Sequence, residues 1–427
     1  MRKKMPYGSD YFRGGYTMKY LVLGASASGL NGAREIRTLD RDGDITLVSI
    51  DDKVYSRCML HYYIGGKRTE ESLNFMSDNF FKDNNIKWIT NTKAVGIDIK
   101  NKSVKLSNGI EEKYDKLLLA TGGSSAVLPI ENLKEANNVI GVRSLDDCDK
   151  IMDLAKKYKK AAVIGAGLIG IDVVSGLLHY NLDKLSVIDI APYMISKQLD
   201  EHTANVYQEK LKENNVEQFY SVKVKKINID SNKNPLSVEL EDGRKIDADF
   251  IVIAMGISPN TDYLKDSGIE LNKMGGVVID KYGKTNIPDI YAAGDITATT
   301  AIWSAAVKQA IIAANNMTGN NIDIDNFFHF KSTMNFFDIP SMSIGNVVPP
   351  DDSYSVEIFD DKKGNYRKIV HKNGKIYGAL LQGDLRYSGI LTQLIKENID
   401  VTKVKKPLFN IDYSDFFNID ENFKFAF

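Results

Sequence analysis

The sequence has few of the features that mark several large protein classes. Only two cysteines, Cys58 and Cys148, occur in 427 residues, so a disulfide scaffold is excluded and a reducing compartment such as the cytoplasm is expected. No apolar run approaches the roughly 18 residues that a membrane-spanning helix needs, and no CxxC or HxxxH spacing indicates a metal site. Neither sign of charge dominates, since 55 Lys and Arg residues and 56 Asp and Glu residues give a net charge of −1. This balance excludes the positive field typical of proteins that bind nucleic acid or anionic membranes.

The first 17 residues also lack the pattern of a secretory signal. Arg2, Lys3 and Lys4 are followed by a polar stretch at 6–10, where a signal peptide would have an apolar one. We expect residues 1–17 to form a disordered extension.

The sequence does contain a repeat. A short apolar strand runs into glycine twice, at Gly24 and at Gly165, with an offset of 141 residues. A second pair of segments, offset by 134 residues, consists of an Asn-Gly or Asp-Gly turn followed by a buried strand, and the turn has the pattern of a β-hairpin. The turns are at Gly109 and Gly243, and the strands end at Gly122 and Gly256. Two pairs in the same order indicate two copies of one nucleotide-binding architecture.

The repeat predicts the domain organisation and an α/β fold class. We expect two Rossmann-like, three-layer nucleotide-binding domains. The first is discontinuous, over 18–127 and 247–326, with the strand at 249–256 returning to it, and the second covers 128–246. No nucleotide motif occurs from residue 327 onward. Strands near 341–348, 355–361, 366–371 and 375–383, followed by a helix at 388–398, predict an α+β C-terminal domain over 327–427.

Both glycine motifs have the spacing of a phosphate-binding turn. A strand that turns sharply into a helix presents free backbone N–H groups, which bind pyrophosphate together with the helix dipole. The first glycine permits the turn, the second lets the phosphates approach, and the third lets helix and strand pack closely. The second motif has Gly165, Gly167 and Gly170, and the first has Gly24, Ser26 and Gly29. One such motif alone is also compatible with an ordinary glycine-rich turn, but both copies here follow apolar strands and precede helical patterns.

An acidic residue follows the next strand in each copy. Asp189 ends the apolar run 185–188, and Asp51 comes shortly after the run 45–48. A carboxylate at this place binds ribose hydroxyls and repels a 2′-phosphate. Because Ile190 and not a basic residue follows Asp189, the second copy favours NADH over NADPH. In the first copy Ser49 or Asp52 is an alternative to Asp51.

Three further motifs resemble those of one family, the FAD-dependent pyridine nucleotide oxidoreductases, over about residues 18–398. They are Ala120-Thr121-Gly122, the segment 285–295 that ends in Asp295, and Trp303-x-x-Ala306-x-x-Gln309. The resemblance implies FAD in the first copy and NAD in the second, with Asp295 on the ribityl chain and Arg57 beside FAD. The other residues it places at the cofactors are Ala120, Thr121, Gly122, Trp303 and Gly256.

The C-terminal domain is most similar to that of the rubredoxin-reductase, nitrite-reductase-flavoprotein and NADH-oxidase branch of this family. The segment 378–384 and the helix after it carry that similarity. In this branch the domain makes a dimer interface, so the resemblance implies a homodimer.

The sequence departs from the family pattern at three places. Tyr63 stands where the two-cysteine reductases have the second cysteine of CxxxxC, and no His-Pro-Thr sequence occurs, so reduction of the glutathione or lipoamide type is excluded. Asp172 replaces a glutamate that often faces the nicotinamide, and it is one methylene shorter.

The sequence allows two interpretations of Cys58. The segment 58–66 resembles the redox-active segment of single-cysteine branches, where Arg57 and a helix N-terminus would lower the pKa of the thiol. Alternatively, Cys58 is a packing residue, as free cysteines commonly are. Likewise His61 is either a proton relay near the flavin or a packing residue.

The expected reaction is hydride transfer from NADH to FAD, followed by transfer of electrons to an acceptor. The resemblance of the C-terminal domain favours a small redox protein such as rubredoxin or ferredoxin. Oxygen, or a CoA disulfide or persulfide reduced through Cys58, is an alternative. A flavin redox sensor or an electron-transfer subunit of a larger complex is an alternative of another class.

Overall fold

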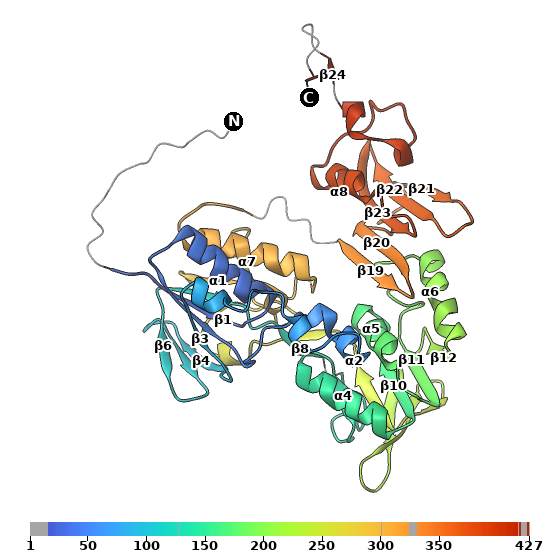
Figure 1. Cartoon of the computed structure of the whole chain (residues 1–427), viewed down its shortest axis with the longest axis horizontal. Helices are drawn as coiled ribbons and strands as arrows, with labels where there is room; N and C mark the ends of the chain where they lie inside the picture. Colours follow the sequence, from blue (N-terminus) through green and yellow to red (C-terminus); the bar gives the residue numbers. More distant parts are fainter. Residues whose placement is uncertain are drawn as a thin grey trace.

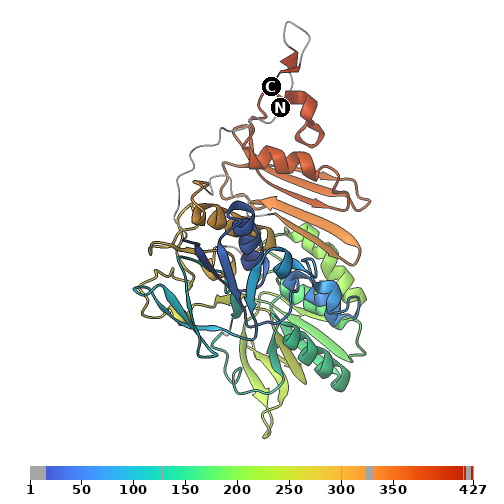
Figure 2. The same ribbon diagram turned by 60° about the vertical axis from the view of Figure 1, so that its left-hand side comes forward.

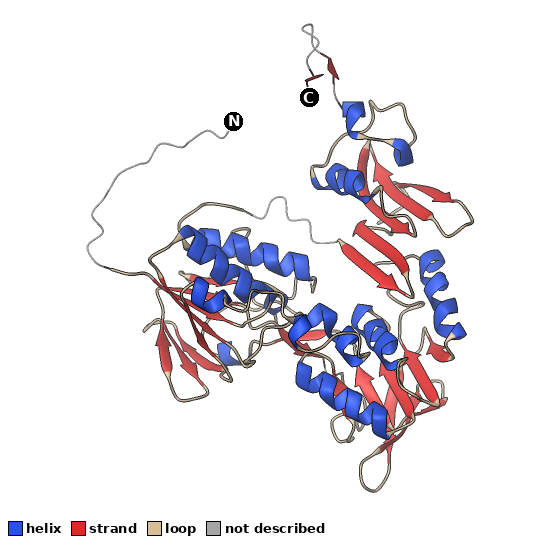
Figure 3. Ribbon diagram, in the orientation of Figure 1, coloured by secondary structure: helices blue, strands red, loops and turns tan. Residues whose placement is uncertain are grey.

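The computed structural model describes residues 16–126, 128–299, 301–323 and 331–416, together with the backbone of 418–419 and 425–426. Figure 1 shows three bodies along the chain, and Figure 3 shows the same view with helices and strands distinguished. Residues 1–15 of the expected extension lie outside the described residues. In the described part of the chain, no helix is long and apolar enough to cross a membrane.

The first body is built on a parallel sheet in the order β18–β7–β1–β2–β3. Its strands are β1 (Lys19–Leu23), β2 (Asp44–Val48), β3 (Ile86–Ile89), β7 (Lys116–Leu119) and β18 (Ile290–Ala292). Successive residues of β1 enter different cores, as expected for a strand covered on both faces. Tyr20 and Val22 pack with helices α1 (Ala27–Leu39) and α7 (Trp303–Met317). Leu21 and Leu23 pack toward an antiparallel sheet of β4 (Ala94–Asp98), β5 (Ser103–Leu106) and β6 (Glu111–Lys113).

The second body repeats this plan with a parallel sheet in the order β12–β11–β10–β16–β9. Its strands are β9 (Val139–Gly141), β10 (Lys160–Ile164), β11 (Lys184–Ile188), β12 (Val216–Phe219) and β16 (Phe250–Ile253). Ala161 and Val163 pack with α4 (Leu145–Lys157), α5 (Leu168–Leu177) and α6 (Glu201–Glu213). Ala162 and Ile164 pack toward a sheet of β13 (Val224–Ile229), β14 (Pro235–Leu240) and β15 (Lys245–Asp247). Both bodies are therefore three-layered, and the expected α/β class is confirmed.

One strand lies in a different sheet from the one expected. The prediction that 249–256 returns to the first domain is wrong, because β16 pairs with β10 and β9 of the second sheet. The register Ile164 to Ile253 in the second body corresponds to Leu23 to Leu119 in the first, so β16 is the counterpart of β7. The chain begins to cross back only afterwards, where β17 (Ile257–Pro259) pairs with β8 (Gly123–Ser125).

The predicted hairpin turns are confirmed. Gly109 and Gly243 have φ of +85° and +88°, a region that glycine adopts without strain, and they join β5 to β6 and β14 to β15. Asn373 and Gly374, with φ of +49° and +73°, join the strands at 366–372 and 375–382 of the third body.

The third body is an antiparallel sheet in the order β19–β20–β23–β22–β21, accompanied by a nine-residue α-helix. These elements are β19 (Ser332–Phe336), β20 (Ile339–Gly345), β21 (Ser355–Asp360), β22 (Tyr366–Lys372), β23 (Lys375–Gln382) and α8 (Ser388–Lys396). The predicted α+β character is confirmed, although residues 327–330 at its expected start lie outside the described residues.

The third body packs against α6 of the second body (Figure 2). The Tyr207 hydroxyl on α6 donates to the carbonyl of Ile339 at 2.7 Å. Asp200, which caps α6, accepts from the Tyr366 hydroxyl at 2.9 Å and from Lys368 Nζ at 3.2 Å. Phe336 and Leu380 join the core of the second body, so the two bodies share one apolar interior.

Candidate functional site at the junction of the two nucleotide-binding bodies

The two glycine turns have the same backbone geometry. Gly24 and Gly165 follow β1 and β10 with φ of +115° and +110°, where residues with a side chain are strained. A Cβ at Gly24 would lie 2.1 Å from the carbonyl oxygen of Ala120, and one at Gly165 would lie 2.4 Å from that of Ala254. Each turn therefore requires glycine, and for the same reason in both bodies.

The third glycine of each motif allows the helix to approach its strand. A Cβ at Gly29 or Gly170 would lie 1.7 or 1.8 Å from the carbonyl oxygen of Gly24 or Gly165. At Gly167, by contrast, a Cβ would meet nothing within 4 Å. The beginning of α5 is thus close to β10 on one side and open on the other, which fits a pyrophosphate on its backbone N–H groups.

The first motif has a serine at the position that corresponds to Gly167. Ser26 is the N-cap of α1, and its side chain makes no capping hydrogen bond. The glycines that end the neighbouring strand segments, Gly122 and Gly256, have φ of +66° and +102° and no atom near an added Cβ. The residues around both turns fit the binding of a dinucleotide.

Asp189 lies directly at the second turn. Its carboxylate accepts a hydrogen bond from the Ala166 N–H, inside the glycine motif, and another from the Ala191 N–H at 2.7 Å. The neighbouring Ile190 is 64% exposed. An acid held beside the turn, with an apolar neighbour, is the arrangement expected for binding ribose hydroxyls.

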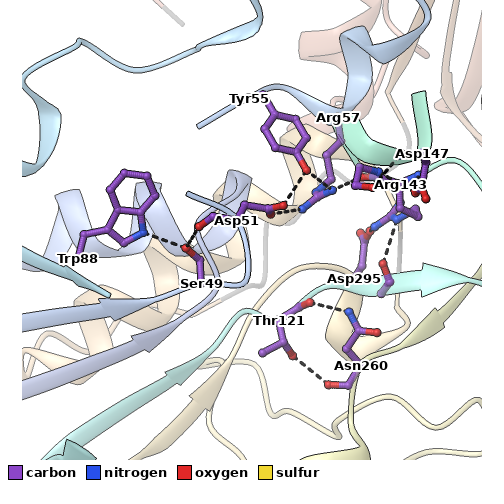
Figure 4. Close-up of polar contacts among 12 residues, drawn as sticks. Ser49, Asp51, Tyr55, Arg57, Trp88, Thr121, Arg143, Asp147, Asn260 and Asp295 are labelled. Carbon is purple, nitrogen blue, oxygen red and sulfur yellow. Dashed lines mark hydrogen bonds and ion pairs between the residues drawn. The ribbon is translucent and has the colours of Figure 1, made fainter. Parts of the chain in front are cut away.

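Ser49 occupies the corresponding position in the first body. Both Ser49 and Asp189 directly follow their strands and donate their backbone N–H to the next strand, at 2.9 and 2.8 Å. The Ser49 hydroxyl accepts from Trp88 Nε1 at 2.9 Å and donates to the carbonyl of Asp51 at 2.6 Å (Figure 4). Of the alternatives left open by the sequence, Ser49 is therefore the topological counterpart of Asp189.

The Asp51 carboxylate points toward a cluster of polar side chains (Figure 4). It forms an ion pair with Arg57 at 2.8 Å and accepts from the Tyr55 hydroxyl at 3.0 Å. Arg57 also donates to the backbone carbonyl of Arg143, which precedes α4 of the second body. Asp51 thus helps to join the two bodies through Arg57.

Arg143 is a site residue that the sequence did not indicate. Its guanidinium pairs with Asp295 at 2.8 Å and donates to the carbonyl of Gly123 at 2.9 Å (Figure 4). Asp295 itself lies close to α1, because a Cβ on the preceding Gly294 would meet the Ser28 hydroxyl at 2.2 Å. Arg143 therefore connects the second body to the neighbourhood of the first turn.

Asn260 is a second residue without a sequence signal. Its side-chain amide donates to the Thr121 carbonyl at 2.9 Å, and the Thr121 hydroxyl donates to the Asn260 carbonyl at 3.0 Å. This pair holds the end of β7 against the connection between the bodies. Trp303, at the start of α7, packs edge-on against Phe75 with ring centroids 4.7 Å apart.

Cys58 and His61 lie where α2 (Leu60–Ile64) packs against α5 and α4. Nδ1 of His61 lies 3.3 Å from Oδ1 of Asp172 on α5. Cys58 is exposed, but the residues packed around it remove part of the water that would hydrate its thiolate. This loss of hydration, together with the carboxylates of Asp172 and Asp295, raises the pKa of Cys58 to about 11. This is opposite to the lowering that Arg57 was expected to cause, because the Arg57 guanidinium pairs with Asp51.

The remaining cysteine is a packing residue. Cys148 is buried in α4, and burial raises its pKa to about 12. Among the described residues, no group of three or more His, Cys, Asp or Glu side chains is arranged to hold a metal ion.

Comparisons with known proteins agree with this geometry. Residues 18–310 match the pyridine nucleotide-disulphide oxidoreductase family, and residues 331–399 match the rubredoxin NAD+ reductase C-terminal domain. The chain is 30% identical to the nitrite reductase [NAD(P)H] of Bacillus subtilis over 91% of its own length, but it spans only 48% of that protein. It is 26% identical to the NADH-rubredoxin oxidoreductase of Clostridium acetobutylicum, over 92% of this chain and 97% of that one.

Among solved structures, an NAD-dependent persulfide reductase from A. fulgidus superimposes with a TM-score of 0.80 at 27% identity, over 90% of this chain and 77% of that one. The expected resemblance to the rubredoxin-reductase branch is confirmed by the match over residues 331–399. The chain belongs to the pyridine nucleotide-disulphide oxidoreductase family, in the branch that includes rubredoxin reductases, nitrite reductases and NADH oxidases.

Proposed function

We propose that this protein oxidises NADH with FAD in its first body and NADH in its second, and that it passes the electrons to a small redox protein such as rubredoxin or ferredoxin. One observation carries the proposal: side chains associated with both turns meet at one junction. Asp172 lies on α5, which begins at the second turn, and Asp295 lies beside α1, which begins at the first. Asp172 lies 3.3 Å from Nδ1 of His61 in the first body, and Asp295 pairs at 2.8 Å with Arg143 of the second body.

When bound, FAD would accept a hydride from the reduced nicotinamide and release electrons one or two at a time. The protein's part is placement. The open helix starts at Ser26 and Gly167 would hold the pyrophosphates, and the ion pairs of Arg57 and Arg143 would fix the two bodies relative to each other. Holding both cofactors at one junction makes the reaction between them effectively unimolecular.

The preference for NADH rests on the surroundings of Asp189. The carboxylate is fixed by two backbone N–H groups at the second turn, and Ile190 offers no cation to a 2′-phosphate. A phosphorylated ribose would therefore meet a negative charge without a compensating positive one.

A protein acceptor is favoured over a thiol route for two reasons. The third body matches the rubredoxin reductase C-terminal domain, and a relative that acts on rubredoxin aligns over nearly the whole length of both chains. The pKa of Cys58, at about 11, leaves little thiolate at neutral pH, and the thiolate is the reactive form.

The third body is also the surface through which we propose a homodimer.

Reduction of a persulfide or a CoA disulfide through Cys58 is the second candidate. The exposure of Cys58 at the junction and the similarity to a persulfide reductase favour it.

The two candidates differ in their dependence on Cys58. We expect Cys58→Ser to reduce rubredoxin with NADH at the wild-type rate, like its matched control Cys148→Ser. The assay is stopped-flow reduction of the flavin by NADH, followed by addition of rubredoxin, ferredoxin or a persulfide in separate mixtures. A Cys58→Ser variant whose flavin is reduced normally but whose transfer to every acceptor is lost would establish the thiol route. A flavin that NADH does not reduce in the wild type would overturn the proposal itself.

A further inference from the structure

The two carboxylates near Cys58, Asp295 and Asp172, differ in the positively charged groups that lie beside them. Asp295 forms an ion pair with the Arg143 guanidinium at 2.8 Å. In the described part of the chain, no Lys or Arg forms an ion pair with Asp172, and the basic group beside it is the His61 ring, 3.3 Å away. Asp172 is three-quarters covered by protein, since 25% of its side chain is exposed. Without a permanent cation, a negative charge at this position would be poorly compensated.

The His61 ring lies in surroundings that oppose a positive charge. Burial, together with the cations of Lys67 and Arg68, lowers its pKa to about 4. Among the described residues of the neighbouring elements, Asp149 of α4 accepts from the Tyr63 hydroxyl at 2.8 Å, and α5 contributes Asp172 and, near Gly65, the second imidazole His179. The ring is therefore uncharged at neutral pH.

One nitrogen of this neutral ring lacks a hydrogen-bond partner. Nδ1 of His61 is buried, and among the described residues it makes no hydrogen bond, although Oδ1 of Asp172 lies within reach. In the neutral tautomer that carries its proton on Nε2, Nδ1 is a buried acceptor without a donor, which is unfavourable. A proton on Asp172, after a small rotation of the ring or of the carboxyl group, would supply that donor and remove the uncompensated charge at once.

We propose that Asp172 is a carboxylic acid at neutral pH, that it donates its proton to Nδ1 of neutral His61, and that this pair is a proton-holding site joining the two bodies beside Cys58. Burial raises the pKa of Asp172 well above its ordinary value, in agreement with this assignment. The inference deepens the proposed function, on which it rests for the meaning of the site, but it concerns the chain's own protons.

The pair controls the charge next to the thiol. As the pH rises, the O–H bond of Asp172 breaks and the proton passes to solvent. The bonding electrons stay on the carboxylate, so nothing is oxidised or reduced. The new carboxylate then raises the pKa of Cys58, so the thiol and the pair titrate together and not as independent groups. At neutral pH the site therefore has one negative charge fewer than it would have if Asp172 were ionised.

The protonated carboxyl group can be observed directly. We expect pH-difference infrared spectra of the purified flavoprotein to show, at neutral pH, a carboxylic-acid C=O band that Asp172→Asn removes. His61→Ala, which takes away the hydrogen-bond acceptor and admits water, should move the disappearance of this band to lower pH. His61→Gln restores an acceptor oxygen and should move it back toward the wild-type pH. Absence of such a band in the wild type, or its persistence in Asp172→Asn, overturns the proposal.

Alkylation of Cys58 tests the coupling to the thiol. In a Cys148→Ser background, iodoacetamide reports on Cys58 alone. At about pH 9 we expect Asp172→Asn to be alkylated roughly tenfold faster than the background protein, because removal of one neighbouring charge shifts a thiol pKa by about one unit. Asp153→Asn, at an exposed carboxylate on α4, is the matched control and should change nothing. Identical pH profiles for Asp172→Asn and the background protein would refute the coupling. Neither measurement uses NADH, so failure here is distinct from failure of the proposed oxidoreductase reaction.

Discussion

The second glycine turn allows one prediction in which two neighbouring substitutions impair different properties of the protein. Gly167→Ala places a methyl group in the open space over the start of α5, where no protein atom lies within 4 Å. Gly170→Ala places the same group 1.8 Å from the carbonyl oxygen of Gly165. The first substitution should impair binding and leave the fold intact, and the second should impair the fold.

The magnitudes follow from these contacts. At Gly167 the φ of −74° suits alanine, so the free energy of unfolding should fall by no more than about 1 kcal/mol, the cost of losing a glycine cap. If the methyl group displaces the pyrophosphate from one backbone N–H, the loss of about 1.5–3 kcal/mol from that charge-assisted bond weakens NADH binding roughly 10- to 150-fold. At Gly170 the clash is with backbone that cannot rotate away, so overpacking should cost about 3 kcal/mol or more.

Both quantities can be measured on the same preparations. NADH affinity is obtained by titration of the anaerobic protein, flavin content from the visible absorbance, and stability from thermal unfolding. We expect Gly167→Ala to keep its flavin and its melting temperature while losing NADH affinity, and Gly170→Ala to melt at a lower temperature. Wild-type NADH affinity in Gly167→Ala would show that the pyrophosphate does not lie on α5, and loss of flavin from that variant would mean that the two bodies have been assigned to the wrong cofactors.

Three further predictions concern other contacts. The double variant Asp189→Ser with Ile190→Arg should raise the use of NADPH relative to NADH, measured as the ratio of kcat/KM values, because the negative charge is replaced by a positive one; an unchanged ratio would mean that another residue reads the ribose. Arg143→Met leaves Asp295 without its cation at the junction and should increase flavin release during dialysis, whereas full retention would show that the ion pair does not support the first site. Burial raises the pKa of Asp200, but hydrogen bonds from neighbouring groups outweigh it and lower the pKa overall, so its contribution to stability is present above about pH 4 and is lost in acid as pH falls through the folded-state value. Asp200→Asn should therefore flatten the acid limb of the thermal-stability profile, and an unaltered limb would assign acid sensitivity to other carboxylates.

The repeat in the sequence predicted most of the architecture. Strands that end in glycine, and turns with Asn-Gly or Asp-Gly, depend on local backbone geometry, and such local signals are visible in single residues. The error at 249–256 came from setting the repeat aside at one point. The strand at 116–119 belongs to the sheet of the first copy. The matching strand at 250–253 therefore belongs to the sheet of the second copy, where β16 pairs with β10.

The site was predicted less completely than the fold. Gly24, Gly165 and Asp189 lie where their motifs placed them, because each is adjacent to a strand end. Arg143 and Asn260 carried no signal, since each acts through a partner more than a hundred residues away. The pKa of Cys58 was expected to be lowered by an adjacent arginine, but it is raised by loss of hydration and by carboxylates that the chain brings from two distant segments.

The sequence by itself determined that this protein has two turns of the dinucleotide-binding type, because the first and third glycines of each motif are required by contacts within a few residues or with the neighbouring strand of the same copy. Only the tertiary structure decided how the turns are combined. The packing of α2 against α5, the ion pair between Arg143 and Asp295, and the approach of His61 to Asp172 each join one body to the other. Such contacts depend on the relative position of two folded units, which no spacing of residues along the chain expresses.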